Sequence, residues 1–281
     1  MIKKIKIKTL VIYLLLCFFS LIAIGPTLWI FSCALKSGEE IYAYPPSIIP
    51  KNPTLENFAK LQKIRVGQGN MVTATSNGLI VALFATFICL TISTLGGYGL
   101  SRMRSPLKSR LLFFIFFVQL VPAIVLTIPL YIWFADLGII DELIGLIVAY
   151  QSFLVPISTA FVKDYIDSVP VELEESALVD GCNRFWAFIR ISLPLSAPSI
   201  ASVAIFAFLH AWEEYLLASV LILTPDKRTP PLQLAAFIGE YMIDWGGIMA
   251  GAIWVLIPVV LVFLLLQKYF VAGLTAGAVK A

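Results

Sequence analysis

Charge is what this sequence has least of. Lysine, arginine, aspartate and glutamate make up 13% of its 281 residues, whereas a soluble domain has about 25%. So few charged side chains cannot cover a globular surface in contact with water. The low charge therefore excludes an ordinary soluble protein and indicates that much of the surface faces lipid.

The sequence also lacks the residue clusters of common enzymes and metal sites. It contains one histidine, His210, and its four cysteines (Cys17, Cys33, Cys89 and Cys182) show no metal-binding spacing such as C-x-x-C. No G-x-x-x-x-G-K-[ST] phosphate-binding loop is present. We therefore predict no catalytic residue, metal site or cofactor on this chain. The net charge of +3 does not indicate nucleic-acid binding, because basic residues of membrane proteins normally set topology.

What the sequence has in abundance is long apolar stretches. A helix needs roughly 20 apolar residues to cross the hydrocarbon core of a bilayer, which is about 30 Å thick. A β-barrel would show short alternating segments instead. The sequence thus predicts a single all-α membrane domain with six transmembrane helices, and prolines inside them are expected to be tolerated. The six predicted helices span residues 9–35, 75–100, 110–134, 139–162, 194–223 and 246–269.

The first stretch follows Lys3, Lys4, Lys6 and Lys8, a pattern that secretory signals share. Its apolar run is longer than the core of a signal, and no cleavage site stands out, so we expect this helix to be retained.

Charged loops predict the orientation in the cell membrane. The loop at 101–110 contains four cations and no acid, whereas the next loop contains Asp136, Asp141 and Glu142 and no cation. Lysine and arginine are enriched in cytoplasmic loops. We expect the first loop and both termini in the cytoplasm and the second loop outside.

The external segment 36–74 includes a predicted short helix over residues 54–61, capped by Thr54.

A segment at 168–193, between the fourth and fifth predicted helices, is expected in the cytoplasm. Pro170 suits the first turn of a helix over 170–180, where three glutamates complement the positive end of the helix dipole. Gly181 stands where this helix should stop. Asn183 then caps a second short helix that is expected to end before Pro194.

The second short helix is rich in large apolar residues, among them Phe185 and Trp186. Such residues on a cytoplasmic helix need a partner surface. The protein's own membrane helices, the lipid interface and another subunit are all compatible with the composition.

Motifs in this segment give a resemblance to a known family. Glu175-Ser176-Ala177, Gly181 and Ile191-x-Leu193-Pro194 resemble the cytoplasmic signature of binding-protein-dependent ABC permeases. That signature reads Glu-Ala-Ala, three residues, Gly, nine residues, Ile-x-Leu-Pro, and the one departure here is Ser176. The segments at 50–58, 98–102, 212–215 and 269–280 are similar to carbohydrate permeases related to the second membrane subunit of the maltose importer. Glu213 departs from the asparagine usual in that subfamily.

The resemblance implies a permease subunit of an ATP-driven importer for a sugar or oligosaccharide. An external solute-binding protein would deliver the substrate. It implies a heterodimer with a second, homologous permease and an ATPase dimer that carries ATP and magnesium. The helix–turn–helix would couple ATPase closure to alternating access. The residues implied in coupling are Glu172, Glu174, Glu175, Ser176, Ala177, Asp180, Gly181, Phe185, Trp186, Leu193 and Pro194.

The resemblance also assigns a role to the cytoplasmic tail at 271–281. In relatives this tail reaches the ATPase dimer interface, which implies contacts by Gly273, Leu274, Thr275 and Gly277. Its glycines fit an inserted extended strand, and equally a frayed terminus.

Polar residues in the fifth predicted helix are candidates for a transport pathway: His210, Trp212, Glu213, Glu214 and Tyr215. An ionised side chain at the centre of a bilayer costs about 2.5–3.5 kcal/mol, so these residues should not face lipid. On a continuous helix His210 and Glu214 would share a face and could pair. Helix packing is the alternative role.

Two alternative functions remain open at this stage. The first is a related permease for a non-sugar solute, such as a phosphorylated glycerol compound or a polyamine. The second is a proton-coupled secondary transporter in which His210, Glu213 and Glu214 carry protons. A membrane enzyme has no supporting cluster of residues.

Overall fold

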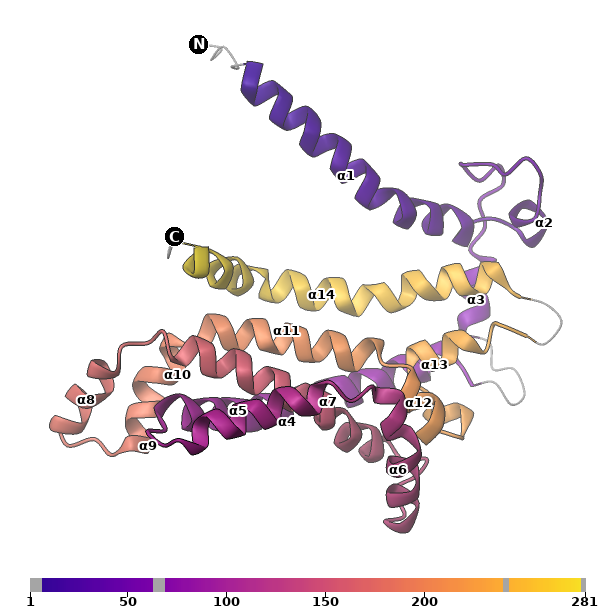
Figure 1. The fold of residues 1–281 in the computed structure, drawn as a ribbon. Coiled ribbons are helices and arrows are strands. Elements are labelled where there is room, and N and C mark those ends of the chain that lie inside the picture. Colours follow the sequence, from indigo (N-terminus) through magenta and orange to yellow (C-terminus); the bar gives the residue numbers. More distant parts are fainter. Residues whose placement is uncertain (1–6, 63–68, 240–242, 279–281) are drawn as a thin grey trace. The chain divides into compact units, whose positions relative to one another are not determined.

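The computed structural model describes residues 7–62, 69–239 and 243–278, with the backbone alone at residues 7, 8, 10 and 268–278. Figure 1 shows the order of the elements, which are helical throughout the described part apart from one isolated bridge between Ile238 and Ile243. The chain divides into two compact units. Unit 1 comprises residues 1–65 and 234–256, and unit 2 comprises residues 66–233 and 257–281.

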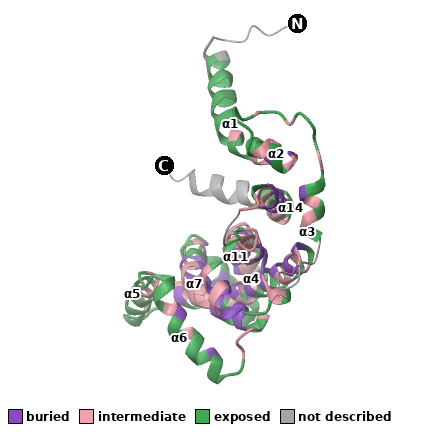
Figure 2. Cartoon of the chain, turned by 90° about the vertical axis from the view of Figure 1, so that its right-hand side faces the viewer, coloured by how far each residue is buried: buried purple, intermediate pink, exposed green. Residues whose placement is uncertain are grey.

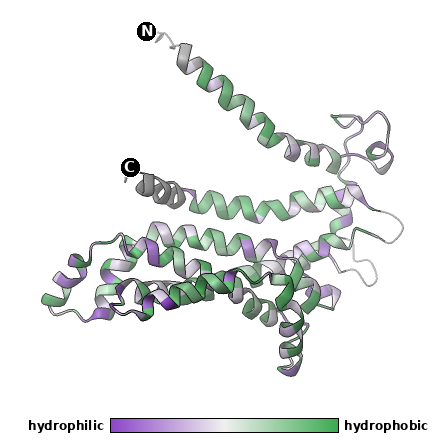
Figure 3. Cartoon of the chain, viewed as in Figure 1, coloured by the Kyte–Doolittle hydropathy of each residue, from purple (hydrophilic) through white to green (hydrophobic). Residues whose placement is uncertain are grey.

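Four helices are long and apolar enough to cross a membrane, and their hydrophobic residues dominate Figure 3. Two further pairs of helices also qualify if each bent pair counts as one span, so the described residues hold four to six spans. This number is compatible with the predicted six. The four long helices are α1 (Ile7–Ala34), α4 (Met71–Arg102), α7 (Leu143–Ile166) and α14 (Trp245–Ala278).

The third predicted helix is divided in the structure. Instead of one helix over 110–134, the chain forms α5 (Leu107–Gln119) and α6 (Ala123–Asp136), with a bend of 93° between them. Pro122 lies at the break, with φ −60° and ψ 135°. Proline has no N–H to donate, and it disfavours the helical conformation of the residue before it, so the helix ends there.

The fifth predicted helix is divided as well. The segment 194–223 forms α10 (Leu193–Leu195), α11 (Ala197–Glu213) and α12 (Leu216–Leu221). Glu214 has an extended backbone, and its carboxylate accepts hydrogen bonds from the N–H groups of Leu217 (2.7 Å) and Ala218 (3.1 Å). Glu214 thus ends one helix and caps the next, which replaces the continuous helix that was expected.

Unit 2 is built around α4, α7 and α11, which pack on one another. Figure 2 shows the buried residues concentrated on α4 and α7, whereas α5 has no buried residue. Gly97 of α4 permits this close approach, because a Cβ there would lie 2.8 Å from Val162 and 2.9 Å from the backbone nitrogen of Lys163. A cluster of Val162 and Ile166 of α7 and Val203 of α11 joins two of the helices, and Leu90 and Tyr98 of α4 pack against it. Unit 2 therefore contains a rigid three-helix core.

Unit 1 contains α1, α2 (Gly38–Ile41), α3 (Glu56–Gln62) and the first part of α14. The helix α3 confirms the predicted short helix, and the Thr54 hydroxyl accepts the N–H of Glu56 at its start. Asn57 is buried and donates to the carbonyls of Ala34 (2.9 Å) and Lys36 (2.7 Å) at the end of α1. Asn57 therefore satisfies carbonyl groups that the end of a helix leaves free.

Replacing Asn57 with alanine is expected to destabilise unit 1 by about 2 kcal/mol, because two buried carbonyls lose their donors. The thermal midpoint of the purified protein in detergent measures this loss. The matched control is Asn52→Ala, which changes the same residue type at an exposed position of the same segment. Equal midpoints for the two variants would contradict the role assigned to Asn57.

Asp141 links two loops of unit 2. Its φ of 60° is rare for a residue other than glycine. Its Oδ1 accepts the N–H groups of Leu223 (2.8 Å) and Thr224 (2.9 Å), and Lys227 Nζ donates to its backbone oxygen (2.7 Å). Burial alone would raise the pKa of Asp141, but these hydrogen bonds and the Lys227 charge lower it below that of a free aspartate. The link is therefore complete above the ordinary pKa of aspartate and weakens as the pH falls through the lowered value.

We expect Asp141→Ala to lower stability by about 2 kcal/mol, since alanine tolerates a positive φ poorly and accepts no hydrogen bond. Asp141→Asn keeps an oxygen in the place of Oδ1 and tolerates this backbone conformation, so its effect should be clearly smaller. Thermal midpoints at pH 7 compare the two variants. An alanine variant as stable as the asparagine variant would refute this account of the link.

Candidate functional site

The segment between α7 and α11 has much of the local structure predicted for it. Pro170 precedes α8 (Val171–Val179), and Gly181 follows it with a φ of +89°. A Cβ at Gly181 would meet nothing within 4 Å, so glycine is required there for its backbone conformation rather than for space. Asn183 caps α9 (Arg184–Ala187) by accepting the N–H of Trp186 (2.9 Å).

The second short helix differs from the prediction after Ala187. The backbone forms a π-helical turn over Phe188–Ser192 and continues through α10, so Pro194 lies inside helical structure instead of beyond its end. Proline is tolerated in a first helical turn, where its missing N–H has no partner to lose. The helical stretch Arg184–Leu195 then meets α11 at an angle of 75°.

Most of the predicted coupling residues lie on the surface of this helix pair. Val179 is the most exposed of the large apolar residues there, with 87% of its surface accessible, and Phe185 follows with 60%. Ala177 and Leu193 are half-buried. The other exposed members of the predicted set are Glu172, Glu175, Ser176, Asp180, Gly181, Trp186 and Pro194.

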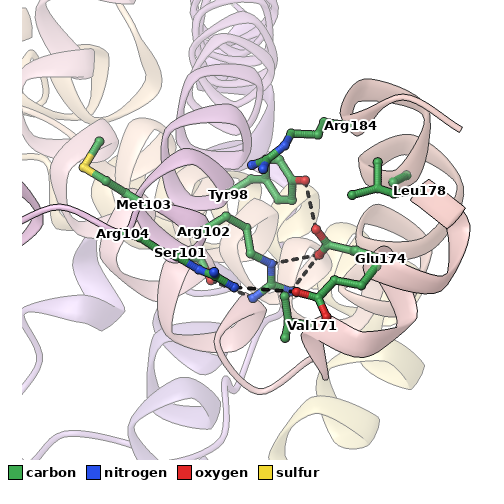
Figure 4. Close-up of a pocket in the computed structure, with 11 residues that line it drawn as sticks. Tyr98, Ser101, Arg102, Met103, Arg104, Val171, Glu174, Leu178 and Arg184 are labelled. Atoms are coloured by element: carbon green, nitrogen blue, oxygen red, sulfur yellow. Dashed lines mark hydrogen bonds and ion pairs between the residues drawn. The ribbon is translucent and has the colours of Figure 1, made fainter.

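Glu174 is the exception, because it is buried and points toward α4 (Figure 4). Its Oε1 accepts hydrogen bonds from Arg102 through both Nε (2.9 Å) and Nη2 (2.7 Å). The hydroxyl of Ser192 donates to the same oxygen (2.5 Å), and the hydroxyl of Tyr98 donates to Oε2 (3.0 Å). The carboxylate thus receives four hydrogen bonds from two other parts of unit 2.

Arg102 makes further contacts with its remaining donors. Its Nη1 donates to the carbonyl of Ile166 (3.3 Å), and its Nη2 donates to the carbonyl of Val169 (3.2 Å). Arg102 therefore joins the end of α4 to the end of α7 as well as to α8. In the sequence, Tyr98 and Arg102 stood out only through the resemblance, and a single arginine at the end of an apolar helix carried no signal of a buried partner.

The electrostatics of this cluster favour charged forms. Burial alone would raise the pKa of Glu174, but the hydrogen bonds from Arg102, Ser192 and Tyr98 outweigh burial and lower it. The pKa of Asp167 is lowered in the same way, since its hydrogen bonds with Lys163 and Ser101 outweigh its desolvation. Both carboxylates are thus ionised at neutral pH, and the Arg102–Glu174 ion pair is intact there.

A polar cavity of about 610 Å³ lies beside this ion pair (Figure 4). One side is formed by the last turn of α4 and the two residues after it, and the other side by α8 and α9. The exposed ion pair between Arg104 and Glu175 (3.6 Å) also lies on its wall. The cavity shows that α8 is not close-packed against α4.

The predicted pathway residues separate into two groups. Trp212 is buried and stacks on Phe208, with ring centroids 6.0 Å apart, and Glu214 caps α12. His210, Glu213 and Tyr215 are exposed in this chain. Because α11 ends at Glu213, His210 and Glu214 do not share one helix face, and the Glu214 carboxylate binds the N–H groups of Leu217 and Ala218. His210 contacts the ring of Phe206 instead, with centroids 4.3 Å apart.

The tail residues Gly273, Leu274, Thr275 and Gly277 lie where the structure describes the backbone alone. That backbone is helical, since α14 continues to Ala278. An extended strand or a frayed end was expected at these positions, and the structure corrects that expectation.

Comparison with known proteins identifies the family. Residues 89–276 match the family described as binding-protein-dependent transport system inner membrane component. The chain belongs to this family. The matched region begins within α4 and includes both Arg102 and the whole segment from α7 to α11.

Curated relatives of this permease span nearly its whole length. The diacetylchitobiose uptake system permease protein DasC of Streptomyces coelicolor is 36% identical over 257 residues, which cover 91% of each chain. The galactooligosaccharides transport system permease protein GanQ of Bacillus subtilis is 34% identical over 277 residues, which cover 98% of this chain and 96% of GanQ. These relatives are transport permeases and not enzymes.

A solved structure shares the fold of this permease. A chain of a bacterial ABC transporter involved in the import of the acidic polysaccharide alginate superposes with a TM-score of 0.75. The two chains are 23% identical, and the likeness covers 95% of this chain and 98% of the other. At this identity the likeness establishes the fold alone.

Proposed function

We propose that this chain is the membrane-spanning subunit of an ATP-driven, binding-protein-dependent importer for a sugar or oligosaccharide. The observation that carries the proposal is the helix pair α8–α9. It bears the family signature, and it exposes acidic and large apolar side chains that the rest of the described chain leaves uncovered. Exposed apolar residues on a short helix pair are typical of a surface that binds another subunit.

The exposed residues of the pair form the proposed contact with an ATPase subunit. Phe185, Trp186 and Val179 supply apolar area, and Glu172, Glu175 and Asp180 supply charge. Ser176 and Ala177 are small, which allows close approach. Gly181 sets the turn between the two helices, while Leu193 and Pro194 carry the second helix toward α11. The last turns of α14, which include Gly273, Leu274, Thr275 and Gly277, are proposed as a second contact with the ATPase.

The proposal includes partners and an orientation. An ATPase dimer binds ATP and magnesium, because this chain lacks a phosphate-binding loop. A second, homologous permease completes the translocation path, and a solute-binding protein delivers the substrate from outside. The arginine- and lysine-rich loop at 101–110 supports a cytoplasmic location for α8–α9 and both termini.

A sugar is supported by the relatives, which are named for diacetylchitobiose, galactooligosaccharides and, in Mycobacterium tuberculosis, trehalose. The exposed residues His210, Glu213 and Tyr215 are proposed to line the path, since facing lipid would be costly for ionised groups. An aromatic ring and hydrogen-bonding side chains suit the apolar faces and the hydroxyl groups of a sugar.

The test is purification of the tagged chain in mild detergent from its native cells, followed by mass spectrometry of the proteins that accompany it. We expect an ATPase and a second permease. The double variant Phe185→Ala/Trp186→Ala should lose most of the ATPase, whereas Phe113→Ala, an exposed position of α5, should retain it. Recovery of the wild-type chain alone would contradict the proposal and favour a secondary transporter.

A further inference from the structure

Side chains connect α8 to α4 across an open space. In the described chain α8 packs mainly on α9 and the π-helical turn, and the cavity of about 610 Å³ separates it from the last turn of α4. Arg102 and Glu174 reach across this space and meet at 2.7 Å. The direct connection from α8 to α4 therefore depends on these two side chains more than on close-packed apolar contacts.

The Arg102–Glu174 pair also joins the chain on both sides of the coupling segment. Arg102 binds the carbonyls of Ile166 and Val169 where α7 ends, and Glu174 binds Ser192 where the chain turns toward α11. One ion pair thus connects α8 to α4, to the end of α7 and to the π-helical turn that leads to α11.

The chemistry of the pair suits a rigid connection. Only 14% of the Arg102 side chain and 8% of the Glu174 side chain are accessible. A buried ion pair gains little net stability over apolar packing, because its charges must first be desolvated. It does fix direction, since the planar guanidinium donates several hydrogen bonds at set angles. The contact of the Tyr98 and Phe188 rings, with centroids 4.5 Å apart, holds the same joint from the apolar side.

We infer that the Arg102–Glu174 pair is the strut that transmits movement of α8 to the α4–α7–α11 core, with Tyr98 and Ser192 as positioning residues. This inference rests on the proposed function, because it assumes that an ATPase moves α8. It gives Glu174 an internal role, in place of the ATPase contact expected from the resemblance. Exposed Glu172 and Glu175 remain available for the ATPase.

The experiment measures whether α8 and α4 move as one body. Spin labels are placed at Leu173 on α8 and Leu95 on α4, which are 45% and 52% exposed, in a chain whose native cysteines are replaced. Distances between the labels are recorded by pulsed electron paramagnetic resonance in the complex with its ATPase, with and without ATP. We expect one narrow distribution that ATP leaves unchanged.

In Arg102→Met the distribution should broaden, and ATP should now shift it, because α8 moves without the core. Arg102→Lys keeps the charge and should recover part of the wild-type behaviour. The matched control is Arg104→Met, which removes an exposed ion pair two residues further along the chain and should leave the distances unchanged. If Arg102→Met does not reach the membrane, Glu174→Gln and Tyr98→Phe test the same joint with smaller changes.

The outcomes distinguish failure of the inference about Arg102 and Glu174 from failure of the proposed function. A narrow, ATP-independent distribution in both Arg102→Met and Glu174→Gln would overturn the strut. Failure of the wild-type chain to bind an ATPase would instead overturn the proposed function. In that case the width of the distribution in the isolated chain still decides whether Arg102 holds α8 to α4.

Discussion

Replacing Gly181 with valine is expected to reduce sugar uptake by about tenfold or more while the protein still reaches the membrane. Gly181 has a φ of +89°, a conformation that a β-branched residue adopts only with strain of about 1–3 kcal/mol. No neighbouring atom would collide with the new side chain, so the strain acts on the backbone of the turn alone. The turn would relax by changing the angle between α8 and α9, and thereby separate the residues proposed to bind the ATPase.

The measurement is uptake of radiolabelled diacetylchitobiose, galactooligosaccharide and trehalose by cells that carry the variant, with the amount of membrane-inserted protein determined in parallel. Gly138→Val is the matched control, because Gly138 also has a positive φ (+68°) and open space around it, in the turn between α6 and α7. It should cost similar stability without a comparable loss of uptake. Wild-type uptake by the Gly181 variant would remove the turn from the coupling mechanism.

The sequence predicted the features of this protein that local physical chemistry determines. The apolar stretches gave the long helices, and the positions of Pro170, Gly181 and Asn183 gave the limits of α8 and the start of α9. These features depend on residues close together in the chain. Caps, turn glycines and the thickness of a bilayer act over a few residues or one helix, so they can be inferred without a fold.

The features that the sequence did not predict depend on contacts between distant residues. The position of Pro122 allowed either a tolerated kink or a complete break, and the structure shows a bend of 93°. Glu174 and Glu175 are adjacent glutamates in one helix, yet one is buried against Arg102 and the other is exposed. Only the fold brings residue 102 to residue 174. The role of Glu174 therefore could not be inferred from spacing.

Replacing Glu214 is the second change for which we expect a large effect. Its variants show whether Glu214 caps a helix or carries protons. We expect Glu214→Ala to destabilise the protein by about 2 kcal/mol, because the N–H groups of Leu217 and Ala218 lose their acceptors. Leu217 and Ala218 are buried, so water does not replace the lost acceptors. Each N–H group binds a different oxygen of the carboxylate, so Glu214→Gln retains one of the two acceptors and should lose about half as much. Thermal midpoints in detergent compare the two variants.

Transport completes this test, because the same variants separate an importer from a proton-coupled transporter. If Glu214 carried protons, glutamine and alanine would abolish uptake equally, since neither residue ionises. If Glu214 is a cap, the glutamine variant should keep most of its uptake, and the alanine variant should lose uptake in proportion to its lost stability. The matched control is Glu213→Gln. Glu213 is exposed at the end of α11 and caps no helix in the described chain. This change should therefore alter uptake and leave the thermal midpoint unchanged. Equal loss of uptake in both Glu214 variants, with unaltered midpoints, would favour a proton pathway over the helix cap.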